Sequence, residues 1–260
     1  MKLMGVVVIA VCAIIWSAAC FAQSIKLLAE PWPPYVIVDA KGGVSGADVE
    51  VARTVLARMG YQVEIVIRPW RRVLTEAQSL QADGVIDLFY KKERESWVVY
   101  PNEPLSVSGE VIFSLKRKPV RYDSLASLKG LRIGIQQDYF YGYEFDRATQ
   151  FKKIAMTGTD NIAKQLTLLQ MDRLDGVVMN EYVGQYWIRG LGLQDDIGRF
   201  GGYVTKDNRN FLAFTKKPGA RDLAQDFGRA LAHFKQEEAY QVIMRKYHFS
   251  EGDVSTHRVH

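Results

Sequence analysis

Short apolar runs and helix-period patterns alternate along this chain. An apolar run bounded by turn residues predicts a buried strand, whereas apolar residues three or four positions apart predict a helix with one buried face. Residues 45–60 show the helical pattern, with Val51, Val55 and Met59 on one side, and Gly60 is a typical helix end. Residues 84–89 show the strand pattern and end in Phe89. The chain therefore mixes strands and helices from its first elements onward.

The predicted elements form two runs of alternating strands and helices, separated by a polar break at residues 116–119. The first run has strands at 24–29, 36–38, 63–67, 85–89 and 111–115, with helices at 45–60, 69–82 and 93–99. The second has strands at 131–135, 153–156 and 176–179, a short strand or extended segment at 197–203, and helices at 124–130, 143–149, 159–171 and 181–189. A strand at 210–214 and helices at 221–234 and 237–247 complete the chain. This order predicts α/β sheets with helices packed on them.

Residues 1–22 have the layout of a secretory signal peptide. A short basic start is followed by an apolar run that is short for a membrane span, and then by small residues ending in Ala22. Cleavage after Ala22 predicts a mature chain from Gln23. Two alternatives are an acylated Cys20, because residues 17–20 resemble a lipobox, and a retained anchor. Cleavage after Ala22 gives a secreted periplasmic protein, and acylation of Cys20 gives a lipid-anchored periplasmic protein.

Composition narrows the function classes further. Both cysteines, Cys12 and Cys20, lie in the leader, so a mature chain has no disulfide, cysteine metal site or thiol nucleophile. The formal net charge is +5, acidic and basic residues are interspersed, and no Lys/Arg-rich block occurs. This pattern argues against nucleic-acid binding.

The sequence lacks the common catalytic and cofactor motifs. It contains no P-loop, G-x-G-x-x-G, G-x-S-x-G or H-E-x-x-H pattern, and all four histidines lie at or beyond His233. We therefore expect no enzyme activity, no catalytic residues, no cofactor and no metal site. A binding function is the natural alternative.

Two stretches supply candidate binding residues. The strand at 84–89 runs through Phe89 and Tyr90 into a charged turn that carries Arg94. Strand ends that pass into loops are where α/β sheets place ligands, so Arg94 is a candidate anchor for an anion, with a solvated surface charge as the alternative. Trp32 and Tyr35 lie on a loop that three prolines hold extended, which suits stacking on a ligand or capping of the core.

Read together, several segments resemble the bacterial extracellular solute-binding proteins of family 3. The segments are Pro34-Tyr35, residues 46–50, residues 84–87 leading to Glu93-Arg94, residues 128–135, residues 174–178 and residues 240–247. They extend over nearly the whole chain after the leader. Each is weak alone, but their order and spacing are fairly specific.

The resemblance implies the type II periplasmic-binding-protein fold, with two lobes that are each a mixed sheet flanked by helices and a ligand cleft between them. Lobe 1 would comprise residues 23–115 and 209–250, lobe 2 residues 116–208, and residues 251–260 a flexible tail. The two crossovers would lie near residues 114–118 and 203–211.

The resemblance also implies roles for single residues. Arg94 matches the family arginine that clamps a ligand carboxylate, which suits the fork of a guanidinium. Trp32 matches the aromatic of the first loop, with Glu30 as the neighbouring acid. Asn180 falls where the family has an aspartate for the α-amino group, which argues against an ordinary α-amino acid ligand. The full candidate set is Glu30, Trp32, Tyr35, Trp70, Phe89, Tyr90, Arg94, Asp138, Tyr139, Phe140 and Asn180.

The second-lobe loop departs from the family in carrying Asp138, Tyr139 and Phe140 instead of a Gly-Ser or Gly-Thr anion site. These residues and Glu30 favour a cationic or aromatic ligand group. We predict a monomeric periplasmic protein that captures a small polar solute, such as an amino acid, and presents it to an ABC permease in the inner membrane. The alternatives are a stand-alone periplasmic sensor and a dehydratase-type enzyme on the same scaffold.

Overall fold

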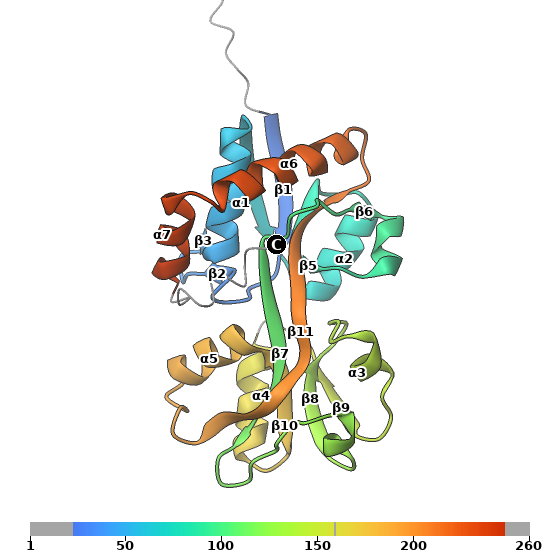
Figure 1. The fold of residues 1–260 in the computed structure, drawn as a ribbon, viewed down its shortest axis with the longest axis vertical. Helices are drawn as coiled ribbons and strands as arrows, with labels where there is room; N and C mark the ends of the chain where they lie inside the picture. Colours follow the sequence, from blue (N-terminus) through green and yellow to red (C-terminus); the bar gives the residue numbers. More distant parts are fainter. Residues whose placement is uncertain (1–22, 159, 248–260) are drawn as a thin grey trace, which may run out of the picture.

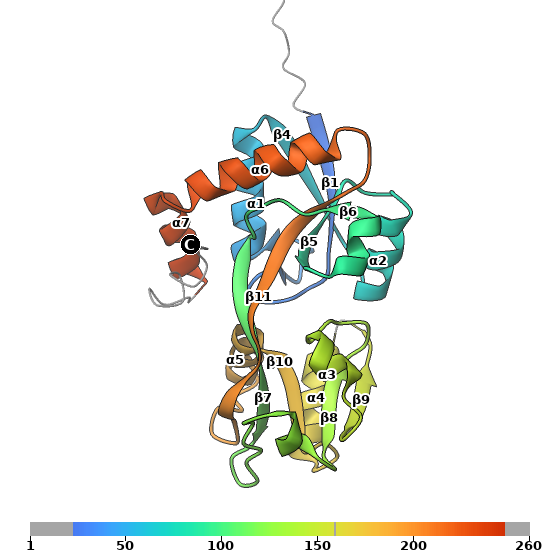
Figure 2. The same cartoon turned by 45° about the vertical axis from the view of Figure 1, so that its right-hand side comes forward.

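The computed structural model describes residues 23–158 and 160–247, which form two lobes joined by two long strands (Figures 1 and 2). The predicted signal peptide at 1–22, the acylation site at Cys20 and the tail at 251–260 lie outside the described residues. One sheet path runs through both lobes in the order β4-β1-β5-β11-β7-β10-β8-β9. Among the described residues, none of the helices has the length and apolar content needed to cross a membrane.

The upper lobe contains a parallel sheet extended by one antiparallel strand. Its strands are β4 (Tyr61–Ile67), β1 (Gln23–Ala29), β5 (Gly84–Phe89) and the last part of β11 (Ile197–Thr215). Its helices are α1 (Ala47–Arg58), α2 (Trp70–Gln78), α6 (Ala220–Phe234) and α7 (Glu238–Lys246). The short elements are β2 (Ile37–Val38), β3 (Val44–Ser45), the 3₁₀ helix η1 (Lys92–Ser96) and β6 (Val98–Val99).

Apolar side chains from both faces of this sheet form the upper core. Val51, Val55 and Leu56 of α1 are almost completely buried, as the helical spacing predicts. The rings of Phe214 on β11 and Phe227 on α6 meet edge to face at 5.5 Å. Burial of each large apolar side chain contributes about 1.5–3 kcal/mol, so these contacts hold the last helices on the sheet.

The lower lobe repeats the plan on a smaller scale. Its strands are β7 (Ser106–Leu115), β10 (Gly176–Asn180), β8 (Arg132–Gln136) and β9 (Lys152–Met156), and β8 is parallel to both β10 and β9. Its helices are α3 (Tyr143–Arg147), α4 (Asn161–Gln170), α5 (Glu181–Gly190) and the 3₁₀ helix η2 (Leu125–Leu128).

Strands β7 and β11 run antiparallel to each other through both lobes (Figure 2). Their pairing register shifts between Arg199 and Tyr203, again before Thr205, and again before Asn208. The expectation of two separate strands at 197–203 and 210–214 is wrong, because one strand of 19 residues covers both. Strand β7 likewise begins five residues before the expected strand at 111, since the polar residues between 106 and 110 pair with β11. The lobe boundaries proposed at 115 and 208 stay a prediction.

The expected helix at 93–99 is also wrong. Residues Lys92–Ser96 form η1, a 3₁₀ helix, and Val98–Val99 form the strand β6, which pairs with β11. Val98 and Val99 pair with Thr215 and Phe214 at the end of β11, which holds this part of the segment extended. The strand at 84–89 agrees with β5, all six residues of which are buried.

Candidate functional site

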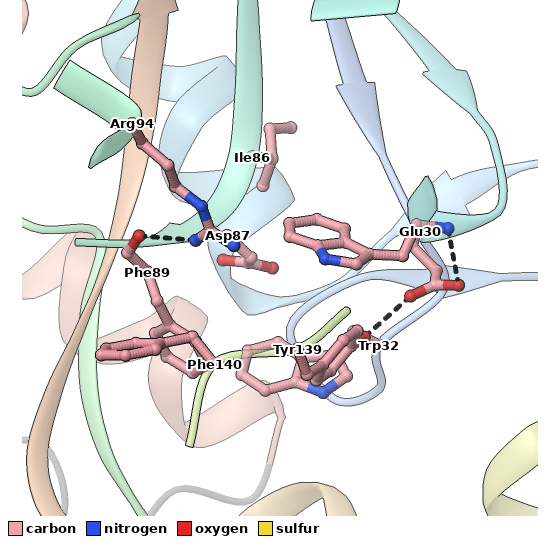
Figure 3. A pocket seen from close by; sticks show the side chains of 9 residues that line it. Glu30, Trp32, Ile86, Asp87, Phe89, Arg94, Tyr139 and Phe140 are labelled. Carbon is pink, nitrogen blue, oxygen red and sulfur yellow. Dashed lines mark hydrogen bonds between the residues drawn. The ribbon is translucent and has the colours of Figure 1, made fainter. Parts of the chain in front are cut away.

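A narrow cavity lies where the carboxyl ends of β1 and β5 face the loop after β8 (Figure 3). The parallel order of β4, β1 and β5 brings these strand ends to one edge of the upper sheet, where α/β folds place ligands. The lining residues come from both lobes and are Glu30, Trp32, Trp70, Ile86, Asp87, Phe89, Arg94, Tyr139 and Phe140.

Arg94 contributes a buried cation to this cavity. Its residue is only 8% exposed, and one guanidinium nitrogen, Nη1, donates to the carbonyl of Phe89 at 2.8 Å. The guanidinium also lies 5.9 Å from the centroid of the Trp70 ring. Burial lowers the pKa of Arg94 from its ordinary value, and the nearby Tyr100 hydroxyl opposes this lowering. In the described part of the chain, Lys92 of the same 3₁₀ helix pairs with Glu95, but no carboxylate pairs with Arg94.

Aromatic rings form most of the cavity wall. Trp32 stacks on Tyr35 at 4.7 Å and meets the edge of Phe89 at 5.7 Å, whereas Trp70 meets Tyr139 at 5.5 Å. Tyr35 is completely buried behind Trp32, so it supports that ring instead of lining the cavity. Such walls favour flat apolar groups or planar cations over strongly hydrated ones.

Glu30 connects the two lobes across the cavity. Its carboxylate accepts hydrogen bonds from the Trp70 backbone N–H at 3.0 Å, from Gln136 Nε2 at 2.8 Å and from the Tyr139 hydroxyl at 2.7 Å. Burial raises the pKa of Glu30, and these three hydrogen bonds oppose the rise. Because Gln136 and Tyr139 belong to the lower lobe, Glu30 binds the lobes to each other.

A second, small cavity lies behind the wall formed by Trp32 and Tyr139. Its polar residues include Glu110 on β7 and Asn180 at the end of β10. Glu110 is 2% exposed, and burial raises the pKa of its carboxyl to about 8. The Asn180 side chain accepts from the backbone N–H groups of Tyr182 and Val183 and donates to Ser108 at 2.6 Å. Asn180 is therefore occupied as the N-cap of α5.

Of the eleven candidates, seven line the main cavity: Glu30, Trp32, Trp70, Phe89, Arg94, Tyr139 and Phe140. Tyr35 and Asn180 lie behind it, as described above. Tyr90 is 44% exposed, lines a separate surface groove and donates to Glu95 at 2.8 Å. The Asp138 carboxylate lies 3.6 Å from Arg71 at an outer groove, and only its carbonyl faces Trp70 Nε1, at 3.3 Å. Ligand binding by these eleven residues stays a prediction.

Sequence reasoning missed two lining residues, Ile86 and Asp87. Ile86 belongs to the short apolar run that predicts a buried strand, so nothing in the sequence marked it as a site residue. Asp87 carried a signal that could have identified it, because a carboxyl inside the apolar run of residues 84–89 has to find a partner or a function.

Comparison with known proteins gives a consistent family. The model of the bacterial extracellular solute-binding proteins, family 3, matches residues 25–251. The histidine-binding periplasmic protein of Salmonella typhimurium is 22% identical over 240 residues, which cover 88% of this chain and 89% of the relative. The lysine/arginine/ornithine-binding periplasmic protein of Escherichia coli is 22% identical over 223 residues, which cover 83% of this chain and 84% of the relative.

Solved structures share the fold at low sequence identity. An ancestral arginine-binding protein bound to arginine has a TM-score of 0.74 and 20% identity, with 87% of this chain and 99% of that chain covered. A histidine kinase sensor domain with similarity to periplasmic binding proteins has a TM-score of 0.75 and 21% identity, with 87% of this chain and 96% of that chain covered. The predicted type II two-lobe fold is thus confirmed.

Proposed function

Since the chain belongs to the bacterial extracellular solute-binding proteins of family 3, we propose that it captures a small carboxylate-bearing solute in the cavity between its lobes. The solute is an amino acid or a related compound. The observation that carries this proposal is Arg94, a buried guanidinium on the cavity wall that has no carboxylate partner among the described residues. A guanidinium offers five N–H donors, and a bidentate carboxylate is the ligand that best matches two of them.

The other walls indicate the chemistry of the rest of the solute. Trp32, Trp70, Tyr139 and Phe140 surround the space with aromatic faces and edges. A side group that is flat and apolar, or planar and cationic, gains stacking or cation–π contacts of about 0.5–2 kcal/mol each. The imidazole and guanidinium groups of the ligands named for the relatives have this shape, which supports a solute of the same kind.

We place the protein in the periplasm, delivered by the leader at 1–22, as a monomer that hands its solute to an ABC permease in the inner membrane. The relatives named as periplasmic binding proteins support this location. Solute release would follow opening of the lobes, the hinge motion by which two-lobe binding proteins close around ligands. No cofactor, metal or nucleic acid enters this proposal.

Titration calorimetry of the chain from residue 23 tests the proposal. The panel contains the twenty L-amino acids, their des-amino analogues and prephenate. Arg94→Ala should weaken binding of the solute at least about 100-fold, because a charge-assisted bidentate pair contributes roughly 2–3 kcal/mol or more. The matched control is Arg58→Ala, because Arg58 is exposed and pairs with Glu237 far from the cavity.

Unchanged affinity in the Arg94 variant would contradict the assigned carboxylate anchor. Turnover of prephenate without stable binding of any panel member would favour an enzyme on this scaffold and overturn the proposed function.

A further inference from the structure

Asp87 occupies an irregular position in β5. Leu88 pairs with Phe211 of β11 and Val85 with Ala213, so Ile86 and Asp87 lie opposite the single residue Leu212. This is a β-bulge, and Asp87 has the left-handed φ of 61° that glycine or asparagine adopts more cheaply. Bulges redirect side chains near functional sites.

The bulge directs the Asp87 carboxyl into the cavity. Asp87 is 9% exposed and lines the same space as Arg94 and Trp32, and Figure 3 shows its carboxyl among the side chains drawn around that space. Within the described residues, neither of its oxygens accepts a hydrogen bond from an N–H group or a hydroxyl. A buried carboxyl without a donor is costly to keep, which points to a partner that arrives with the ligand.

A second carboxyl lies against Asp87. Asp48, in the first turn of α1, is within hydrogen-bond reach of Asp87 and accepts from the Ser106 hydroxyl at 2.6 Å. Two buried carboxyl groups in contact cannot both ionise, so they share a proton. Burial and the neighbouring Asp48 raise the pKa of Asp87 well above its ordinary value, and burial raises that of Asp48.

Few other charged groups face this pair. Lys235, at the end of α6, is the cation whose charge favours ionised Asp48, and it is itself paired with Glu103 at 2.6 Å. The buried Tyr35 hydroxyl interacts with both carboxyls and with Tyr182 of α5, and burial raises its pKa. Glu30 and Arg94 line the same cavity. Among the described residues, the Asp87 carboxyl therefore has no ion-pair partner.

We propose that Asp87 binds the protonated α-amine of the solute whose carboxylate lies on Arg94, and that this cation expels the proton shared by Asp87 and Asp48. The inference rests on the proposed function. It moves recognition of the cation from Asn180, whose side chain is occupied as a helix cap, to the bulge of β5. The expelled proton passes to the buffer, and no bond other than that O–H bond is broken.

Calorimetry with matched pairs of solutes tests the recognition. The pairs are L-phenylalanine with 3-phenylpropionate, L-histidine with imidazolepropionate, and L-arginine with 5-guanidinopentanoate. The wild-type chain should prefer the amino acid of the binding pair at least tenfold. Asp87→Asn, which keeps a residue suited to the left-handed φ, should reduce that preference to less than threefold, and Asp87→Ser is the second variant if folding suffers.

The same titrations in phosphate and in Tris test the proton release. Tris takes up protons with much more heat evolution, so the observed enthalpy should be more negative in Tris for the wild-type chain. Asp48→Asn should keep the preference and reduce the buffer dependence, because it removes the neighbouring carboxyl that raises the pKa of Asp87 while burial still raises it. Equal preference in wild type and Asp87→Asn, or no buffer dependence in the wild type, overturns the inference while the proposed function stands. A panel without any binder overturns both.

Discussion

Replacing Glu30 by alanine should open the cleft more than any change at its rim. Glu30 is 5% exposed and accepts two hydrogen bonds from the lower lobe, from Gln136 Nε2 and the Tyr139 hydroxyl. Both bonds exist only while the lobes are together. In the open form each partner is hydrated, so the variant loses closure energy without losing the fold.

The size of the effect follows from these two contacts. A hydrogen bond to a charged group contributes about 1.5–3 kcal/mol, so the closed form loses about 3 kcal/mol or more relative to the open form. Since 1.4 kcal/mol corresponds to a factor of ten, the ratio of closed to open protein falls by about 100-fold. The apparent affinity for the solute falls by the same factor where closure limits binding.

Solution scattering of the chain from residue 23 at saturating solute, together with calorimetry, measures both quantities. The matched control is Glu93→Ala. Glu93 accepts from the lower-lobe Tyr143 hydroxyl at 3.0 Å, but this contact is exposed, so water screens it and its loss should change closure much less. Equal losses in the two variants, or a Glu30 variant that closes and binds as wild type does, would refute the reasoning.

Three further predictions concern stability. In the folded protein Glu110 has a pKa of about 8, whereas its unfolded value is near 4.5. Its contribution to stability is therefore complete below pH 4.5 and is lost as the pH rises to 8, so the free energy of unfolding should fall by up to about 4 kcal/mol from pH 5 to 8. Denaturant titrations at pH 5, 6.5 and 8 should show a flatter profile for Glu110→Gln. Asp175 has a lowered pKa because an arginine and a lysine contact its carboxylate, so its contribution is present above pH 4 and lost on acidification; Asp175→Asn should cost about 2 kcal/mol at pH 7 and reduce the acid sensitivity of the melting temperature. Gly46→Ala should lower the free energy of unfolding by more than about 3 kcal/mol, because φ is 123° and the added Cβ would lie 2.1 Å from a backbone carbonyl oxygen. Gly60→Ala, where φ is 87° but the added Cβ meets open space, should lower it by only about 1–2 kcal/mol.

The sequence predicted the fold well because its signals are local and repeated. The apolar runs at β1, β5, β8 and β10 lie between clear turn residues, and the order of segments adds a specific resemblance. It failed where pairing partners decide the structure. The polar residues of the middle of β11 have no strand pattern of their own and become a strand because β7 runs beside them.

The site was predictable only in part, for the same reason. Strand ends pointed to Phe89 and Arg94, both of which line the cavity. Asn180 also follows a predicted strand, but its side-chain oxygen accepts hydrogen bonds from two backbone N–H groups of α5. Asp87 was hidden because a bulge depends on the register between β5 and β11, which no local pattern reveals.

The path of the chain through the two lobes has a consequence for the order of folding. The upper lobe joins distant segments, as the Thr215 hydroxyl donates to the carbonyl of Ala82, 133 positions earlier. Lower-lobe contacts are more local, such as Arg132 with Asp175, 43 positions apart. Because closing longer loops costs more entropy and slows folding, the lower lobe should gain protection from hydrogen exchange first. The cavity would then be the last part of the molecule to form, because its lining residues come from both lobes and the upper lobe folds after the lower one.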